Sequence, residues 1–179
     1  MKTFIALFRG INVGGNNKLP MMELAAVLET LGMQNIRTYI QSGNVVFQDK
    51  ATDAAKRAAQ ISAAIMQSHG FAPKVMLLDA VKLEQAIKDN PFPEAEAAPT
   101  TLHLNFLDAI PAKPNLDALE KIRAPSERFF LKDNVLYLHA PDGIGRSKLA
   151  ANMERLLGVP ITGRNWNTVC KLREMSREM

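Results

Sequence analysis

The first predicted strand, residues 3–9, constrains the fold more than any other segment because it is apolar on both faces. Its sequence, T-F-I-A-L-F-R, is rich in β-branched and aromatic residues and stops at Gly10. Alternate side chains point to opposite faces, with Phe4, Ala6 and Phe8 on one and Ile5 and Leu7 on the other. Such a strand lies in the middle of a sheet that is covered on both sides.

The segments after this strand predict a βαββαβ unit that ends near residue 90. Ser42, Gly43 and Asn44 are turn-forming residues, so the strands on either side of them form a hairpin. The sequence predicts a helix from Pro20 to Gly32, strands over 35–41 and 45–48, a helix with Asp53 as N-cap that ends at Gly70, a strand over 74–78 and a short helix over 80–88.

Residues 90–99, N-P-F-P-E-A-E-A-A-P, show no periodicity and predict a boundary between two halves. The N-terminal half is residues 1–90, the linker is 91–99, and the C-terminal half with a terminal helix is 100–179. Beyond the linker the order repeats, with a strand over 101–107, a helix opened by Pro114, a hairpin over 128–139, a helix that ends at Gly158, a very short strand near Val159–Ile161 or none, and a last helix over 163–176 with Thr162 as N-cap.

A short sequence echo indicates that the two halves are a diverged tandem repeat. Asn44-Val45-Val46-Phe47 in the first hairpin matches Asn134-Val135-Leu136-Tyr137 in the second. The predicted fold class is α+β, with two tandem ferredoxin-like halves of the βαββα type. Each half has an antiparallel sheet with helices on one face, so the doubly apolar first strand needs a second cover. We expect the other half to supply it, which gives one pseudo-symmetric body.

Composition excludes several classes of protein. The chain is 47% hydrophobic and 22% charged, which is typical of a folded domain. Cys170 is the only cysteine, so an intrachain disulfide and a multi-cysteine zinc site are excluded. The longest apolar runs are far shorter than a membrane span, and the first residues lead us to expect no secretory signal. We expect a cytoplasmic protein without a metal or cofactor, because no dinucleotide, Walker A, nucleophile-elbow or metalloprotease motif occurs.

Positive charge is concentrated at the two ends of the chain and suggests an anionic partner. The net charge is +4, and residues 146–179 alone carry seven bases against three acids. The bases occur in glycine- and asparagine-rich segments at predicted helix starts, where backbone N–H groups and the helix dipole favour anions. The candidate ligand-binding residues are Arg9, Asn12, Gly14, Gly15, Lys18, Gln41, Ser42, Asn44, Arg146, Ser147, Lys148, Arg164 and Asn165.

We expect these loops to form one basic cleft for a nucleotide, a phosphorylated metabolite or a nucleic-acid backbone. The same residue types also serve plain turns and helix caps, so a structural role stays open for each loop. An enzyme of phosphoryl or acyl transfer, with His103 or His139 as base, is a second hypothesis. An interaction module is a third, and the chain is a monomer or a homodimer. Trp166 and Cys170 share one helix face and are assigned to the core.

Four motifs together resemble one known family. They are R-G-I-N-V-G-G at 9–15, Q-S-G-N-V at 41–45, G-I-G-R-S-K-L at 143–149 and R-N-W-N-T at 164–168. In this order they are similar to Domain-of-Unknown-Function family 1697, over nearly the whole chain. The resemblance implies small bacterial cytoplasmic proteins with a tandem ferredoxin-like fold. It implies no established activity, so it assigns no catalytic residue.

Overall fold

Strand β1 (Lys2–Arg9) is a central strand, as its two apolar faces predict. In the computed structural model, which describes residues 1–179, it pairs antiparallel with β3 (Asn44–Asp49) on one side and β4 (Lys74–Asp79) on the other. Strand β2 (Gln34–Tyr39) pairs with the outer side of β3, so the order of this four-stranded sheet is β2-β3-β1-β4. The most apolar strand therefore has a hydrogen-bonded neighbour along both edges.

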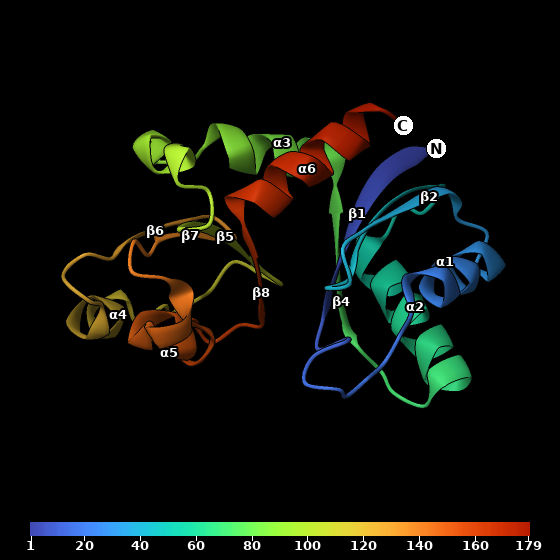
Figure 1. Cartoon of the computed structure of the whole chain (residues 1–179), viewed down its shortest axis with the longest axis horizontal. Coiled ribbons are helices and arrows are strands. Elements are labelled where there is room, and N and C mark those ends of the chain that lie inside the picture. Colours follow the sequence, from blue (N-terminus) through green and yellow to red (C-terminus); the bar gives the residue numbers. More distant parts are fainter. The chain divides into compact units, whose positions relative to one another are not determined.

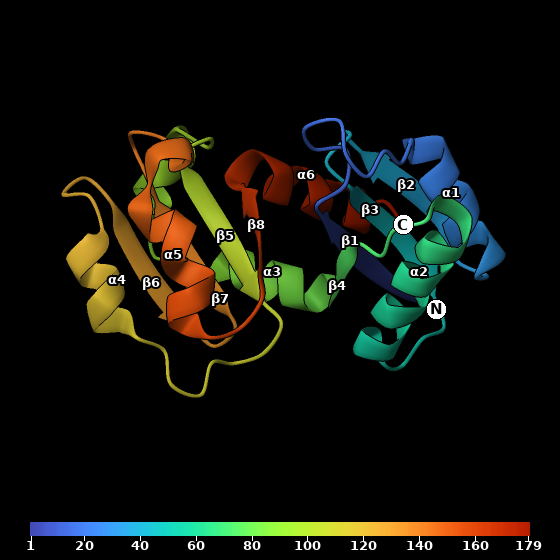
Figure 2. The ribbon, with the colours of Figure 1, turned by 90° about the horizontal axis from the view of Figure 1, so that it is seen from below.

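Helices α1 (Met21–Thr30) and α2 (Ala54–His69) cover one face of this sheet (Figure 2). Asp53 caps α2 by accepting a hydrogen bond of 2.9 Å from the backbone of Lys56, and Gly70 ends the helix in the left-handed conformation, as the sequence predicts. Removal of apolar side chains from water drives the packing of the two helices on the sheet. The core between them contains Phe4, Ala6, Phe8, Leu24, Leu28, Val45, Phe47, Ile61 and Ile65.

The opposite face of the first sheet is also buried, with Ile5, Leu7 and Val46 inaccessible to water. The compact unit that contains this sheet comprises Met1–Gln85 and Lys171–Met179, so it includes part of α3 (Ala80–Lys88) and the end of α6 (Trp166–Arg177). These two helix ends lie side by side (Figure 1), joined by an ion pair of 2.7 Å between Arg177 and Glu84.

The second unit, Ala86–Cys170, has the same order of elements and of strands. Its four-stranded antiparallel sheet has the order β6-β7-β5-β8, in which each strand takes the place of the corresponding strand of the first unit. The fold class is therefore α+β with two tandem ferredoxin-like halves, as predicted. The strands are β5 (Leu102–Leu107), β6 (Arg128–Lys132), β7 (Val135–His139) and β8 (Ile161–Asn165), and the helices on one face are α4 (Leu116–Ile122) and α5 (Lys148–Leu157) (Figure 2).

The segment predicted as a linker has structure of its own. Residues Pro93–Ala97 form a 3-10 helix within the second unit. Glu94 pairs with Arg128 of β6, and Asp89 pairs with Lys132 at 2.8 Å. Glu94 of this segment, and Asp89 just before it, therefore attach it to the edge strand of the second sheet.

The start of α6 differs from the prediction. Thr162 lies buried within β8, and Asn165 caps the helix by accepting a hydrogen bond of 3.0 Å from the backbone of Thr168. Thr and Asn are both favourable N-caps, so residue type alone does not distinguish Thr162 from Asn165; the length of the preceding strand does. Pairing of Ile161–Asn165 with β5 extends the last strand to residue 165.

The sequence echo between the two hairpins is out of register in the structure. Phe47 packs in the core beneath α1 and α2. Tyr137 points to the opposite face of its sheet, because Leu136 and Leu138 on either side of it pack with α4 and α5. A shift of one residue reverses the face of every side chain in a strand. The positions matched by the echo are therefore not equivalent in the two sheets.

A buried ion pair connects the end of β3 to α2. Asp49 is buried, and its Oδ2 lies 2.5 Å from Nε of Arg57. Arg57 also donates a hydrogen bond of 2.7 Å to the carbonyl of Leu31, just after α1. One guanidinium thus links the strand and both helices.

No helix of the chain combines the length and the apolar character that crossing a bilayer requires.

We predict that Asp49→Asn lowers the free energy of unfolding by about 3 kcal/mol, because it leaves the largely buried guanidinium of Arg57 without its counterion. Asp53→Asn is the matched control, since it makes the same chemical change at an exposed N-cap where Asn serves as well as Asp. Urea unfolding of both variants measures the difference. Equal effects of the two substitutions would contradict a structural role for the Asp49–Arg57 pair.

Candidate functional site

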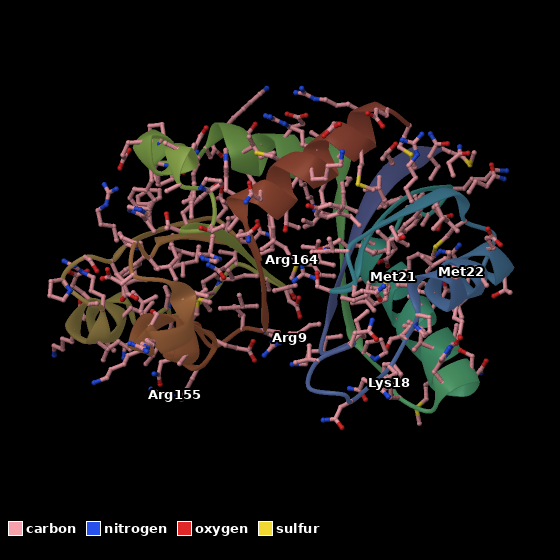
Figure 3. All side chains as sticks on the ribbon, viewed as in Figure 1. Arg9, Lys18, Met21, Met22, Arg155 and Arg164 are labelled. Atoms are coloured by element: carbon pink, nitrogen blue, oxygen red, sulfur yellow. The ribbon has the colours of Figure 1, made fainter.

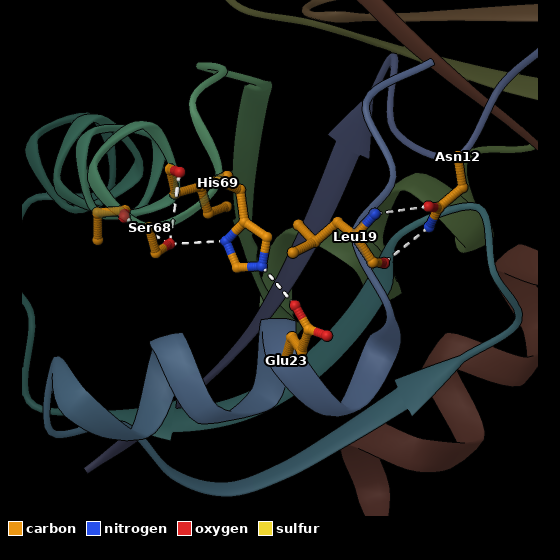
Figure 4. A network of polar contacts seen from close by, with 7 residues as sticks. Asn12, Leu19, Glu23, Ser68 and His69 are labelled. Carbon is orange, nitrogen blue, oxygen red and sulfur yellow. Dashed lines mark hydrogen bonds and ion pairs between the residues drawn. The ribbon is translucent and has the colours of Figure 1, made fainter. Parts of the chain in front are cut away.

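The loop between β1 and α1 is held in shape by Asn12 (Figure 4). Its Oδ1 accepts a hydrogen bond of 2.8 Å from the backbone N–H of Leu19, and its Nδ2 donates to the carbonyl of Leu19 at 2.9 Å. The same Nδ2 donates to the carbonyl of Gln41 at 2.9 Å, which joins this loop to the turn between β2 and β3. Asn12 is therefore a structural residue of the loop.

Gly14 and Gly15 form the tip of a small hairpin within this loop. Val13 and Asn16 on either side of them make a β-bridge, and the backbone N–H of Asn16 donates to the carbonyl of Val13 at 3.0 Å. The two glycines have φ of 58° and 79°. A two-residue turn with positive φ at both positions favours glycine. The turn alone accounts for both glycines, so they give no separate evidence of a ligand.

The turn at residues 41–44 packs against the same loop. The backbone N–H of Phe8 donates to the carbonyl of Gly43 at 2.8 Å. Asn44 is fully buried, and its Nδ2 donates to the carbonyl of Tyr39 at 3.2 Å and to Oγ of Ser42 at 3.0 Å. The structure thus brings together the two segments of the first unit that the sequence singled out. Of their residues, the exposed ones are Arg9, Gly14, Gly15, Lys18, Gln41 and Ser42 (Arg9 and Lys18 in Figure 3).

The start of α1 already has a carboxylate of its own. Glu23 lies in the first turn, where its charge suits the helix dipole. Its Oε2 is 2.7 Å from Nε2 of His69 at the end of α2, and the other ring nitrogen of His69 is 2.7 Å from Oγ of Ser68 (Figure 4). This exposed network connects the two helices. It also supplies negative charge where an anionic ligand of α1 would have to bind.

Two helices, α5 and α6, begin without an acid at or next to the first turn. Four other helices have a carboxylate at or next to their first turn, namely Glu23 in α1, Asp53 before α2, Asp79 before α3 and Asp117 in α4. The approach to α5 is instead a 3-10 turn, Ile144–Arg146, followed by Ser147 as N-cap and Lys148 as first residue. The sequence predicts Arg146 and Lys148 at this helix start; in the structure Lys148 is the first helical residue, and Arg146 comes before the cap.

Ser147 is buried and caps α5 through a hydrogen bond of 3.0 Å from the backbone of Ala150. Arg146 and Lys148 are exposed on either side of it, and the structure shows no ion pair for either. Positive charge at a helix N-terminus is unfavourable by about 0.3–1 kcal/mol for each group. Ser147 therefore has a structural role, and the two bases beside it are available to an anion.

The strand register brings both basic segments of the second unit to one edge of the sheet. His103, the second residue of β5, pairs with Asn165 at the end of β8, while Leu102 pairs with His139 at the end of β7. Helix α5 follows β7 and leads to the start of β8, so its N-terminus lies at this edge. Helix α6 also begins here, directly after Asn165. Residues 146–148 and 164–165 therefore lie at the same edge.

The two basic segments reach opposite faces of the sheet at this edge. His103 and Asn105 share a face with Leu107, which packs with α5, so they point toward that helix. Arg164 pairs with Leu104 and points to the other face. Burial lowers the pKa of Arg164 to about 10. Its Nη1 donates to the carbonyl of Gly163 at 2.8 Å (Arg164 in Figure 3).

His103 and Asn105 each have a buried acceptor atom without a hydrogen-bond partner. His103 is 8% exposed and is hydrogen-bonded to the backbone of Thr100, while its Nε2 has no partner. Burial lowers the pKa of His103, so the imidazole is neutral at pH 7. Asn105 is 1% exposed, and its Nδ2 donates to the carbonyl of Leu136 at 3.1 Å, which leaves Oδ1 without a partner.

The two histidines of this half do not form a joint patch. Alternation along a strand places His103 and Asn105 on one face of β5 and Tyr137 and His139 on one face of β7, and register decides whether these faces coincide. They do not coincide, because His139 pairs with Leu102 and paired residues share a face, whereas His103 is on the other face of β5. Nδ1 of His139 is 3.1 Å from Arg128, whose guanidinium stacks over Phe92 at 4.7 Å. No cluster of three metal-ligating side chains occurs in the structure.

Of the two α6 residues assigned to the core, Trp166 and Cys170, only the first is fully buried. Trp166 is buried at 6% exposure, which agrees with its assignment to the core. Cys170 is half-buried, so it is not the fully buried hydrophobe that the pattern predicts.

Fold and site together define a class: a tandem ferredoxin-like α+β protein with an acid-free helix start at one sheet edge. Residues 1–137 match the family described as "Protein of unknown function (DUF1697)", and the chain belongs to this family. It is similar over 98% of both chains to the solved structure of the conserved bacterial protein SP0830 from Streptococcus pneumoniae, with 25% identity and a TM-score of 0.63. No curated protein matches the chain.

We predict that Gly43→Ala destabilises the first unit through a steric clash. A Cβ at residue 43 would lie 2.6 Å from Cβ of Phe8 and from Cδ1 of Ile11. Gly70→Ala is the control, because Gly70 has the same φ of 78° but open space around a Cβ. Overpacking costs about 1–3 kcal/mol, so urea unfolding should show that much additional loss for Gly43→Ala. Equal losses would mean that the turn does not pack against β1 and its loop.

We predict that His103 makes stability fall in mild acid. Its folded-state pKa is lowered, whereas in the unfolded chain it is about 6.5. As the pH falls below about 6.5, the unfolded state takes up a proton that the folded state does not, so stability decreases. Because the pKa of His139 is also lowered, the comparison is made in a His139→Asn background. Adding His103→Asn should reduce the loss of unfolding free energy between pH 7.5 and 5.0, and an unchanged loss would contradict the burial of His103.

Proposed function

We propose that the protein binds a small phosphate-bearing molecule at the start of α5. The observation that carries this proposal is the absence of any acid at a helix start flanked by exposed Arg146 and Lys148. A phosphate at this point receives backbone N–H groups of the first turn, the positive end of the helix dipole and two charged side chains. The ten residues of α5 provide a full helix dipole.

A second observation supports a ligand at this edge. The unpartnered Nε2 of His103 is buried on the face that α5 covers, at the edge where α5 begins. A buried polar atom without a partner costs about 1–3 kcal/mol, which a bound molecule would recover. The chemistry at this edge therefore combines anion-binding groups at the surface with a polar group beneath the helix.

A small ligand fits this arrangement better than a nucleic-acid backbone does. Arg146 and Lys148 flank a single helix start, whereas Arg164 points to the opposite face of the sheet. The bases therefore do not form one row on one face, as contacts to successive phosphates require. In the first unit, Arg9, Lys18, Gln41 and Ser42 are exposed on the two segments that Asn12 joins, and we keep them as a second place for the same class of ligand. We propose a cytoplasmic location for this binding activity.

Of the two candidate bases in the enzyme hypothesis, we retain only His103. His103 faces α5 and is neutral, which suits a general base, whereas His139 lies on the other face. Phosphoryl or acyl transfer also requires a reacting group on the ligand, because the side chains around His103 include no nucleophile in hydrogen-bond contact with it. We therefore propose binding as the function, with catalysis as an additional property that His103 would supply.

The test compares two double variants that each remove two positive charges. Arg146→Ala/Lys148→Ala removes the proposed contacts, and Lys113→Ala/Lys121→Ala removes exposed bases elsewhere in the second unit. Isothermal titration calorimetry with inorganic phosphate and phosphorylated metabolites should show about a tenfold or greater loss of affinity for the first variant only. Equal binding by both variants would overturn the site. If an oligonucleotide bound more tightly than the small phosphates, with a steep salt dependence, the ligand would be a nucleic acid and not a small molecule.

A further inference from the structure

The buried atoms of His103 and Asn105 specify the chemistry of a second part of the ligand. Hydrogen-bonding of the His103 ring to the backbone of Thr100 accounts for one nitrogen, and the pKa of His103 is lowered by burial, so Nε2 of the neutral ring has a lone pair. The amide orientation of Asn105 is fixed by its hydrogen bond to Leu136, so the atom without a partner is an oxygen. Both atoms are therefore acceptors.

Two acceptors on one face require a donor. His103 and Asn105 are two residues apart on β5, so their side chains stand next to each other on the face toward α5. A hydroxyl or amine group can donate to such atoms, whereas the oxygens of a fully ionised phosphate cannot. Each unpartnered acceptor costs about 1–3 kcal/mol, which exceeds the cost of either base at the start of α5.

Glycine at position 163 keeps the carbonyl oxygen of Asn105 in place. Gly163 pairs with Asn105 across the β5–β8 ladder. A Cβ at residue 163 would lie 2.5 Å from Oδ1 of Asn105, so any other residue would displace the amide. The backbone of β8 thus leaves room for this acceptor on the face toward α5.

We propose that the ligand is a hydroxyalkyl or aminoalkyl phosphate whose hydroxyl groups, or the several hydrogens of whose ammonium group, donate to His103 Nε2 and Asn105 Oδ1 while its phosphate binds at the start of α5. This inference rests on the proposed function, because the phosphate positions the donor. The anion-binding groups and His103 lie at one edge of the second sheet, and Asn105 follows two residues farther along β5 on the same face. A molecule with a phosphate and a nearby donor matches both kinds of group. His103 and Asn105 are then specificity residues, and Arg146 and Lys148 are the phosphate-binding residues.

The experiment uses three probes, of which the first two have equal carbon chain length. Glycerol 3-phosphate has hydroxyl groups, n-propyl phosphate has none, and O-phosphoethanolamine provides the amine. We expect the wild-type protein to bind glycerol 3-phosphate or O-phosphoethanolamine about tenfold more tightly than n-propyl phosphate. The imidazole ¹⁵N spectrum should show a shift of His103 Nε2 with the donor-bearing probe and none with n-propyl phosphate. This spectrum needs no variant, so it remains decisive if a substitution prevents folding.

His103→Asn tests the same idea by substitution. It retains a short donor near Thr100 but lacks the acceptor at the Nε2 position, so it should reduce the tenfold preference to near unity without weakening n-propyl phosphate binding. His139→Asn, on the other face, should retain the preference. Binding of all probes with equal affinity and an unmoved His103 resonance would overturn this inference and leave the proposed phosphate site intact. Failure of every phosphate probe to bind would overturn both.

Discussion

The pairing register of β5 with β7 and β8 determines what the second unit presents at its edge. Because His103 pairs with Leu138 and Asn165, its side chain and that of Asn105 face α5. A shift by one residue would turn both toward the other face and place Leu102 and Leu104 beneath the helix. The same ladder fixes the point where β7 ends, and hence the end of the sheet from which the chain leads to α5. The whole proposed site depends on this register.

The relative size of the electrostatic and hydrogen-bonding effects decides which residues matter. Two bases at a helix N-terminus cost less than about 2 kcal/mol together, and solvent reduces that cost further. Two buried acceptors without partners cost about 1–3 kcal/mol each. The acceptors therefore require an explanation more strongly than the bases do. The bases show where a ligand would enter, and the acceptors show what chemistry it would have.

Much of the fold could be predicted because local signals and tertiary packing agree. The doubly apolar β1, the N-cap Asp53 and the left-handed Gly70 follow from residue types whose conformational roles are specific. The α6 cap could not be assigned, because Thr162 and Asn165 are both good N-caps and only the length of β8 separates them. The echo between Phe47 and Tyr137 misled for a similar reason, since sequence similarity contains no information about which face a strand residue occupies.

The candidate site could be predicted only in part. Glycine and asparagine shape turns with the same properties that bind anions, so Gly14, Gly15 and Asn44 could not be separated from true ligand residues by type. Arg146 and Lys148 were found because their charge opposes the helix dipole, a signal that a turn does not produce. The partner-free atoms of His103 and Asn105 had no sequence signal beyond a shared strand face, because the absence of a partner is a property of the packed structure.

The phosphate site at the start of α5 is tested by following backbone amides during titration with inorganic phosphate. In a two-dimensional ¹H–¹⁵N spectrum, we predict saturable shifts for the amides of Lys148, Leu149 and Ala150 at the start of α5. The amides of Met21, Met22 and Glu23 provide the internal comparison, because the first turn of α1 contains the acid Glu23. Equal or larger shifts at the start of α1, or none at the start of α5, would contradict a phosphate site at α5.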